Sequence, residues 1–231
     1  LQAYALKQLI EELGHKVEFV DYHVGAPVIA ENADSKNKFV RKLEKGLETF
    51  RYQAPLSHKF SFIRYKQSFA KKYMPLLGIT DEMNYNPTLD SLVIGSDEVF
   101  NCIQKNSNVG YSTELFGKDN HADRLITYAA SFGNTTLEKL EKYQKANEVG
   151  NLLKKFDAIS VRDANSGSIV EQLTGEEPVY NLDPVLTYDY MNCCNRIPQI
   201  KATEKYLILY AYAGRISNDE ADWIAEYAKK K

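Results

Sequence analysis

The sequence predicts an α/β protein with a mostly parallel sheet that is covered by helices. Short apolar runs rich in β-branched residues alternate along the chain with longer segments whose apolar residues recur at helical spacing. Small and polar residues follow directly after several of the short runs. Because ligands bind beyond the carboxyl ends of strands in open α/β sheets, these polar turns are the candidate functional positions.

Composition excludes several classes of protein. The chain has 231 residues, with 44% hydrophobic and 26% charged residues, as in ordinary soluble globular proteins. A formal net charge of -2 gives no electrostatic case for binding nucleic acid or an anionic membrane. No apolar run approaches the roughly 20 residues that span a bilayer, and no signal peptide is visible.

Cysteine and histidine usage points to a reduced compartment and to no metal site. Cys193 and Cys194 are adjacent, which leaves Cys102 over, and so sparse a set favours the cytoplasm over a disulfide scaffold. The four histidines are scattered, so no metal-ligand spacing is present. We therefore expect a cytoplasmic protein that uses no metal and no cofactor.

The first segments read as the second half of a βαβ crossover. Residues 1–13 have apolar residues at helical spacing, and Gly14 follows as a C-cap. Residues 15–22 alternate in polarity and predict a strand. The first strand of this unit would lie before Leu1, which is itself not a methionine, and we expect part of the N-terminus to be missing.

Two amphipathic helices are predicted next, over residues 36–50 and 59–73, with Pro75 ending the second. This section is rich in lysine and arginine. A solvated helix face is the favoured interpretation. The alternative is a face that meets an acidic polysaccharide or a lipid-linked acceptor.

The central strand covers Leu92–Ile94 and is closed by Gly95. Ser96 and Asp97 come next, then Asn101. A hydroxyl and a carboxylate at a strand end suit a sugar or an acid as ligand. On pattern alone, a simple turn and N-cap is the favoured interpretation.

The remaining chain repeats the alternation of strand and helix. Strands are predicted over 124–130, 157–161, 178–180 and 206–210. Helices are predicted over about 137–154, capped by Thr135 or Thr136, over 165–173, ended by Gly175, and after Ser217, which forms a capping box with Glu220. Residues 104–123 are expected to be loop and short turns, 182–186 a tight loop and 188–204 a connector.

Four stretches stand in order along the chain: Gly95–Asn101, Tyr128–Gly133, Ile159–Asp163 and Leu182–Leu186. Together they resemble the polysaccharide pyruvyl transferase family, and residues Leu1–Leu6 resemble the family's first helix. Gly95–Asn101 is similar to the family signature Gly-Ser-Asp-Gln-Val-Trp-Asn, with Glu98 and Phe100 as departures. Asp163, where the family usually has Glu, is a further departure.

The resemblance implies a two-domain, glycosyltransferase-B-like enzyme with Rossmann-like domains. By analogy, residues 1–200 form the N-terminal domain without its first strand, and residues 201–231 begin a truncated second domain. The implied reaction moves pyruvate from phosphoenolpyruvate onto a sugar of a bacterial-type cell-surface polysaccharide or its precursor, as a ketal. The partners are therefore phosphoenolpyruvate and a glycan or lipid-linked sugar; the oligomeric state is not predicted.

With the resemblance, Asp97 is the candidate catalytic residue, as an acceptor for a hydroxyl proton. Arg162 is the best anion partner, and its alternative is a structural ion pair with Asp163 or Asp183. Asp183, before Pro184, is expected to bond nearby amides. Further candidates for substrate binding are Ser96, Asn101, Ser131, Gly133 and Asn134; the last three are expected to offer amides at a helix start to a phosphate.

Two other functions fit the same frame. One is a nucleotide-sugar glycosyltransferase, and the other is a carbohydrate-binding relative without catalysis. The residues show no Ser-His-Asp order and no glycosidase-type carboxylate pair, so hydrolysis is not indicated. No general acid is identified, and it is expected in the second domain. We therefore expect the isolated chain to be inactive.

Overall fold

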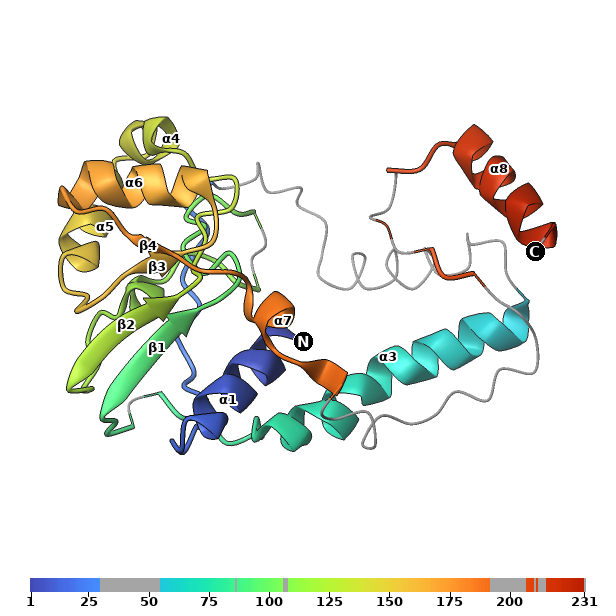
Figure 1. Ribbon diagram of the computed structural model, residues 1–231, viewed down its shortest axis with the longest axis horizontal. Coiled ribbons are helices and arrows are strands. Elements are labelled where there is room, and N and C mark those ends of the chain that lie inside the picture. The colour runs from blue at the N-terminus through green and yellow to red at the C-terminus, as the bar shows by residue number, and fades with distance from the viewer. Residues whose placement is uncertain are drawn as a thin grey trace. The chain divides into compact units, whose positions relative to one another are not determined.

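The sequence folds into two compact units, Leu1–Tyr188 and Asp189–Lys231 (Figure 1). The computed structural model describes residues 1–29, 55–85, 87–105, 108–191, 207–209, 211 and 215–230. The predicted helix over 36–50 and the connector from residue 192 onward lie outside these ranges. No helix in the described ranges is long and apolar enough to cross a bilayer.

In the described residues of the first unit, four short strands form a parallel framework (Figure 1). Their bounds are β1, Ser91–Gly95; β2, Arg124–Tyr128; β3, Ser160–Val161; and β4, Val179–Tyr180. β1 pairs in parallel with β2, and β3 pairs in parallel with β4. Parallel bridges Ile126–Ala158 and Ala130–Val161 connect the two pairs. The α/β class with parallel pairing is therefore confirmed.

Helices connect the strands, but the predicted helix over 137–154 is two helices, α4 (Leu137–Lys142) and α5 (Ala146–Leu153). Gln144 has φ +56°, a left-handed conformation that an α-helix cannot continue through, so the periodic pattern is broken there. Thr136, rather than Thr135, caps α4 by accepting a hydrogen bond from the Lys139 amide. α6 (Ala164–Thr174) ends at Gly175 as predicted.

The N-terminal region keeps its helix but not its strand. α1 (Gln2–Glu12) is confirmed. The predicted strand over 15–22 is wrong, because this segment forms no ladder with a neighbour. Instead, the Asp21 amide bonds the Asn84 carbonyl at 2.8 Å, and the Asn84 amide returns a bond to the Asp21 carboxylate. Alternating polarity here thus accompanies a segment that is held by hydrogen bonds to Asn84 and not by a strand ladder.

α3 (Leu56–Leu77) is longer than predicted, because Pro75 lies inside its last turn. The helix ends at Gly78, whose φ of +89° suits a glycine C-cap. Near the C-terminus of the first unit, the predicted tight loop over 182–186 is a short helix, α7 (Pro184–Thr187), capped by Asp183. Proline at the first helical position favours such a start.

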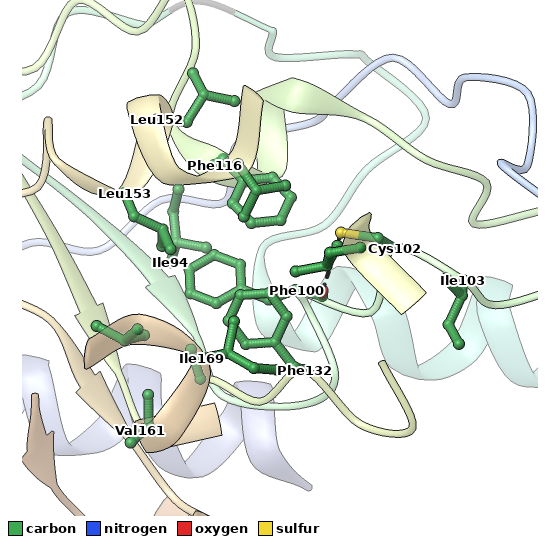
Figure 2. Packing of buried hydrophobic residues seen from close by; sticks show 14 of the residues in the cluster. Ile94, Phe100, Cys102, Ile103, Phe116, Phe132, Leu152, Leu153, Val161 and Ile169 are labelled. Carbon is green, nitrogen blue, oxygen red and sulfur yellow. Dashed lines mark hydrogen bonds between the residues drawn. The ribbon is translucent and has the colours of Figure 1, made fainter. Parts of the chain in front are cut away.

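Three phenylalanines form the centre of the core (Figure 2). Phe100, Phe116 and Phe132 are 0%, 2% and 0% exposed. The Phe100 and Phe116 rings stack with centroids 4.6 Å apart, and the Phe132 ring lies 5.2 Å from Phe100. Phe100 and Phe132 follow the ends of β1 and β2, so they anchor the loops that emerge there.

The second unit contains α8 (Asn218–Lys229), which begins with the predicted capping box. The Ser217 hydroxyl accepts from the Glu220 amide, and the Glu220 carboxylate accepts from the Ser217 amide at 2.8 Å. The predicted strand over 206–210 is only partly described; residues 207–209 are not in a strand.

Candidate functional site at the carboxyl ends of the strands

The candidate side chains follow successive parallel strands. Asp97 comes after β1, Ser131 after β2, Arg162 after β3 and Asp183 after β4. Because the strands are parallel, their carboxyl ends lie along one edge of the sheet. The structure therefore brings together residues that are up to 86 positions apart in the sequence, from Asp97 to Asp183.

Arg162 lies between two carboxylates. Its Nη1 donates to Asp183 Oδ2 at 2.6 Å, and its Nη2 lies 3.6 Å from Asp97 Oδ1. The Arg162 side chain is 23% exposed and that of Asp183 is 19% exposed, whereas that of Asp97 is 71% exposed. The guanidinium thus has one edge fixed in the protein and another that faces an accessible carboxylate.

Asp183 is held by several donors in addition to Arg162. The Val185 amide bonds its Oδ1 at 3.0 Å, as expected for an acid before proline, and Gln2 Nε2 bonds its Oδ2 at 2.5 Å. Burial alone would raise the pKa of Asp183, but the hydrogen bonds from Val185, Gln2 and Arg162 outweigh it and hold the pKa below its ordinary value. The carboxylate is therefore charged and fixes the direction of Arg162.

Asp163, the other partner considered for Arg162, is engaged elsewhere. Its Oδ2 accepts hydrogen bonds from the hydroxyls of Ser131 at 2.7 Å and Ser166 at 2.8 Å. Its Oδ1 accepts from the Ser166 amide and caps α6. Of the two ion pairs considered from the sequence, the structure therefore forms the one with Asp183.

Reciprocal backbone bonds join the loops after β1 and β2. The Ser131 amide donates to the Asp97 carbonyl at 3.1 Å, and the Phe100 amide donates to the Ser131 carbonyl at 3.0 Å. Asp97 has φ +79°, which is uncommon for a residue with a side chain. Since the Phe100 amide is used by Ser131, the Asp97 carboxylate does not cap it.

Asn101 is turned into the protein. Its Nδ2 donates to Glu98 Oε2 at 2.8 Å, and its Oδ1 accepts from the hydroxyl of buried Thr135 at 2.9 Å. Asn101 is 7% exposed. Glu98, where the family usually has Gln, therefore supplies the carboxylate oxygen that accepts this bond.

The remaining candidates differ in what they offer. Ser96 is 3% exposed, and its Oγ has no hydrogen-bond partner among the described residues. The Gly133 amide donates to Ser131 Oγ at 3.0 Å, so it is used within the loop. Asn134 is exposed, and α4 begins only at Leu137, three residues later. The amides of Ser131 and Gly133 thus hold the loops, and do not form a helix start.

Sequence reasoning missed some residues of this arrangement. The helical spacing predicts only that Gln2 lies in a helix, and it does not report that the Gln2 side-chain amide donates to Asp183. Asp163 and Asp183 are both possible ion-pair partners of Arg162 in the sequence, and only the three-dimensional arrangement shows which of them Arg162 contacts.

In the described part of the chain, no group of three or more His, Cys, Asp and Glu side chains is placed to hold a metal ion.

Comparison with known proteins identifies the family. A model of polysaccharide pyruvyl transferase matches residues 1–230. Searches of curated proteins and of solved structures gave no match. Since the family model spans almost the whole sequence, and the four signature stretches fall on the strand ends described above, the chain belongs to the polysaccharide pyruvyl transferase family.

Proposed function

We propose that the strand-end site binds phosphoenolpyruvate through Arg162 and that the enzyme transfers pyruvate to a sugar of a cell-surface polysaccharide or its precursor. The observation that supports this most directly is the placement of Arg162. Its Nη1 is fixed by Asp183, while its Nη2 lies at the exposed side, 3.6 Å from Asp97. A fixed guanidinium is well suited to a carboxylate or a phosphate, which it can bind with paired hydrogen bonds.

The proposed reaction assigns Asp97 to the acceptor. Two hydroxyls of the sugar form bonds to C2 of phosphoenolpyruvate, and the bond from C2 to the phosphate oxygen breaks. The two hydroxyls release two protons. One proton is matched by the proton that the methylene carbon gains on becoming a methyl group, and the other is taken up by the released phosphate. The exposed Asp97 carboxylate accepts a proton from one sugar hydroxyl. The group that protonates the methylene is not assigned.

The neighbouring residues have supporting roles in this proposal. Ser96 places a buried hydroxyl directly before Asp97, and a hydroxyl without a partner is costly unless a ligand or water bonds it. Asn134 offers an exposed amide on the loop after β2. Ser131, Gly133 and Asn101 keep the two loops in place through the bonds described above. No cofactor is part of the proposal.

Donor binding tests the role of Arg162. We expect Arg162→Ala to weaken phosphoenolpyruvate binding at least tenfold by calorimetry, because a charge-assisted hydrogen bond contributes about 1.5–3 kcal/mol. Arg124→Ala is the matched control, since this exposed arginine lies at the opposite, amino end of β2. Unchanged affinity for Arg162→Ala, with the fold intact by circular dichroism, would remove Arg162 from the donor site.

Asp97→Asn separates binding from transfer. We expect it to keep or tighten donor binding, because it removes a negative charge 3.6 Å from the guanidinium, and to lower sugar-dependent phosphate release. If nucleotide sugars bind through Arg162 and phosphoenolpyruvate does not, the site belongs to a glycosyltransferase. If sugars bind and no phosphate is released by an enzyme that includes all its domains, the chain is a carbohydrate-binding relative.

A further inference from the structure

Helix α3 is strongly positive, although the formal net charge of the whole chain is slightly negative. Over its 22 residues it contains no aspartate or glutamate. Its cations are Lys59, Arg64, Lys66, Lys71 and Lys72. The formal net charge of the chain is nevertheless -2, and it was this total that gave no reason to expect contact with an anionic surface. The helix is therefore a strongly positive segment within a slightly negative chain.

The same helix exposes a stripe of large apolar side chains. Phe62, Tyr65, Phe69 and Leu76 are 51%, 52%, 39% and 76% exposed. Their spacing of three, four and seven residues places them along one side of a helix. The Tyr65 and Phe69 rings meet edge to face with centroids 5.7 Å apart. These residues form what we call the α3 stripe, and no residue of α3 is buried.

Lys66 and Lys72 border the α3 stripe. At 100° per residue they lie on its two sides, whereas Arg64 and Lys71 lie on the opposite side of the helix. The Lys72 ammonium is 5.1 Å from the Tyr73 ring centroid, next to Phe69. A helix that lies in a membrane interface has this composition: aromatic and leucine side chains enter the boundary between headgroups and acyl chains, and lysines remain at the anionic headgroups.

We propose that α3 docks on the surface of an anionic phospholipid bilayer through the α3 stripe, with Lys66 and Lys72 against the headgroups. An acidic polysaccharide would also attract the cations. However, a polysaccharide would leave Leu76 and the edges of the phenylalanine rings in contact with water, whereas a lipid surface would remove them from water. The inference goes beyond pyruvyl transfer, because neither the surface nor its test involves the strand-end site.

Vesicle binding provides a test with a matched pair of variants. Sedimentation should recover the purified chain with vesicles of phosphatidylcholine and phosphatidylglycerol in equal parts, and not with phosphatidylcholine alone. Lys66→Gln with Lys72→Gln should weaken binding about 25-fold, about fivefold for each lysine. The control is Lys154→Gln with Lys155→Gln, an adjacent exposed pair beyond α5, which should bind as the unmodified chain does.

A separate experiment measures whether the α3 stripe inserts into the bilayer, independently of the attraction between the lysines and the anionic headgroups. Trp223 is the sole tryptophan of the sequence, so Trp223→Phe combined with Phe69→Trp reports on the stripe alone. We expect its emission to shift to shorter wavelength with anionic vesicles and to be quenched by brominated acyl chains. Phe62→Ser should weaken binding without changing the circular dichroism spectrum, because Phe62 is exposed.

Three results would overturn the proposal. The first is no recovery with anionic vesicles at about 0.1 M salt, where charges within about 10 Å still interact. The second is equal weakening by the two lysine pairs. The third is binding to an acidic polysaccharide such as polygalacturonate without any vesicle binding, which would assign α3 to a glycan.

Discussion

The strand-end region and helix α3 use the same kinds of side chain in opposite ways. At the strand ends, Arg162 is paired with carboxylates, and the neighbouring Phe100 and Phe132 are fully buried. On α3, cations occur without acids in the same helix, and Phe62 and Phe69 are exposed. Aromatic and basic residues thus have partners within the fold in one region, and are exposed in the other.

This difference indicates where the sequence is constrained. In the strand-end region, a substitution changes packing, an ion pair or a loop, so we expect it to change the stability of the protein. On α3, a substitution changes a surface, so stability should hardly respond while binding does. The predictions below compare one change in each region wherever the chain offers a matched residue.

Removal of a phenylalanine side chain from each region should give the largest difference in the free energy of unfolding. Phe100→Ala should lower the free energy of unfolding by about 3–5 kcal/mol, because it leaves a cavity between Phe116 and Phe132. Phe69→Ala on α3 should change it by less than about 0.5 kcal/mol. Chemical denaturation followed by circular dichroism measures both. Similar losses for the two variants would show that α3 packs as tightly as the core.

The Asp183 carboxylate should contribute a pH-dependent part of the stability. Its folded-state pKa lies below the ordinary value, so its contribution is complete above the unfolded-state pKa and is lost as the pH falls through the folded-state pKa. At pH 7, Asp183→Asn should cost about 2 kcal/mol, since charge-assisted hydrogen bonds are lost. The difference from the unmodified chain should shrink below about pH 4.

The control for this prediction is Asp123→Asn, a change at an exposed acid before β2. At pH 7 its free energy of unfolding should differ from that of the unmodified chain by less than about 0.5 kcal/mol. An Asp183→Asn difference that persists unchanged at pH 2 would mean that the loss arises from packing and not from the charge.

Alanine substitutions at two glycines distinguish the stability cost of backbone strain from the cost of a steric collision. Gly133 has φ +55°, and a Cβ there would collide with the Glu98 carboxylate and approach the Asn101 amide. Gly175 has φ +84° with no atom within 4 Å of such a Cβ. Both changes to Ala should cost about 1 kcal/mol for the positive φ, and Gly133→Ala should cost more and weaken donor binding as well. Equal costs would show that the loop adjusts freely.

Removal of a hydroxyl group from each region should give the smallest difference in stability. Thr136 caps α4 next to the strand-end loops, so Thr136→Ala should cost about 1 kcal/mol. Ser68 lies within α3, where its hydroxyl bonds the Tyr65 carbonyl, and Ser68→Ala should be neutral or slightly stabilising because alanine favours helix. Thermal melts compare the pair. A loss for Ser68→Ala equal to that for Thr136→Ala would contradict the comparison.

Local patterns predicted most of the framework. β1 and α6 and the caps at Thr136, Gly175 and Ser217 follow from β-branched runs, helical spacing and N-cap or C-cap residues, all of which act within a few positions. The break at Gln144 and the missing strand over 15–22 depend on long-range packing, which periodicity does not report. The predicted domain boundary at residue 200 stays a prediction.

The candidate site was predictable in its composition and not in its pairing. The tips of successive parallel strands had to meet, so Asp97, Ser131 and Arg162 were expected to be neighbours. The choice of Asp183 over Asp163 for Arg162 follows from the hydroxyls of Ser131 and Ser166, which occupy Asp163. The orientation of Asn101 into the fold follows likewise from buried Thr135.

The loops after β1 and β2 are joined by side chains as well as by backbone bonds. Thr135 bonds Asn101, and a Cβ at Gly133 would collide with Glu98, so neither loop can be exchanged for a relative's version by itself. Swaps of the two segments should therefore be strongly non-additive, harmful singly and tolerated together. Recombined variants should fold best when both segments come from the same parent.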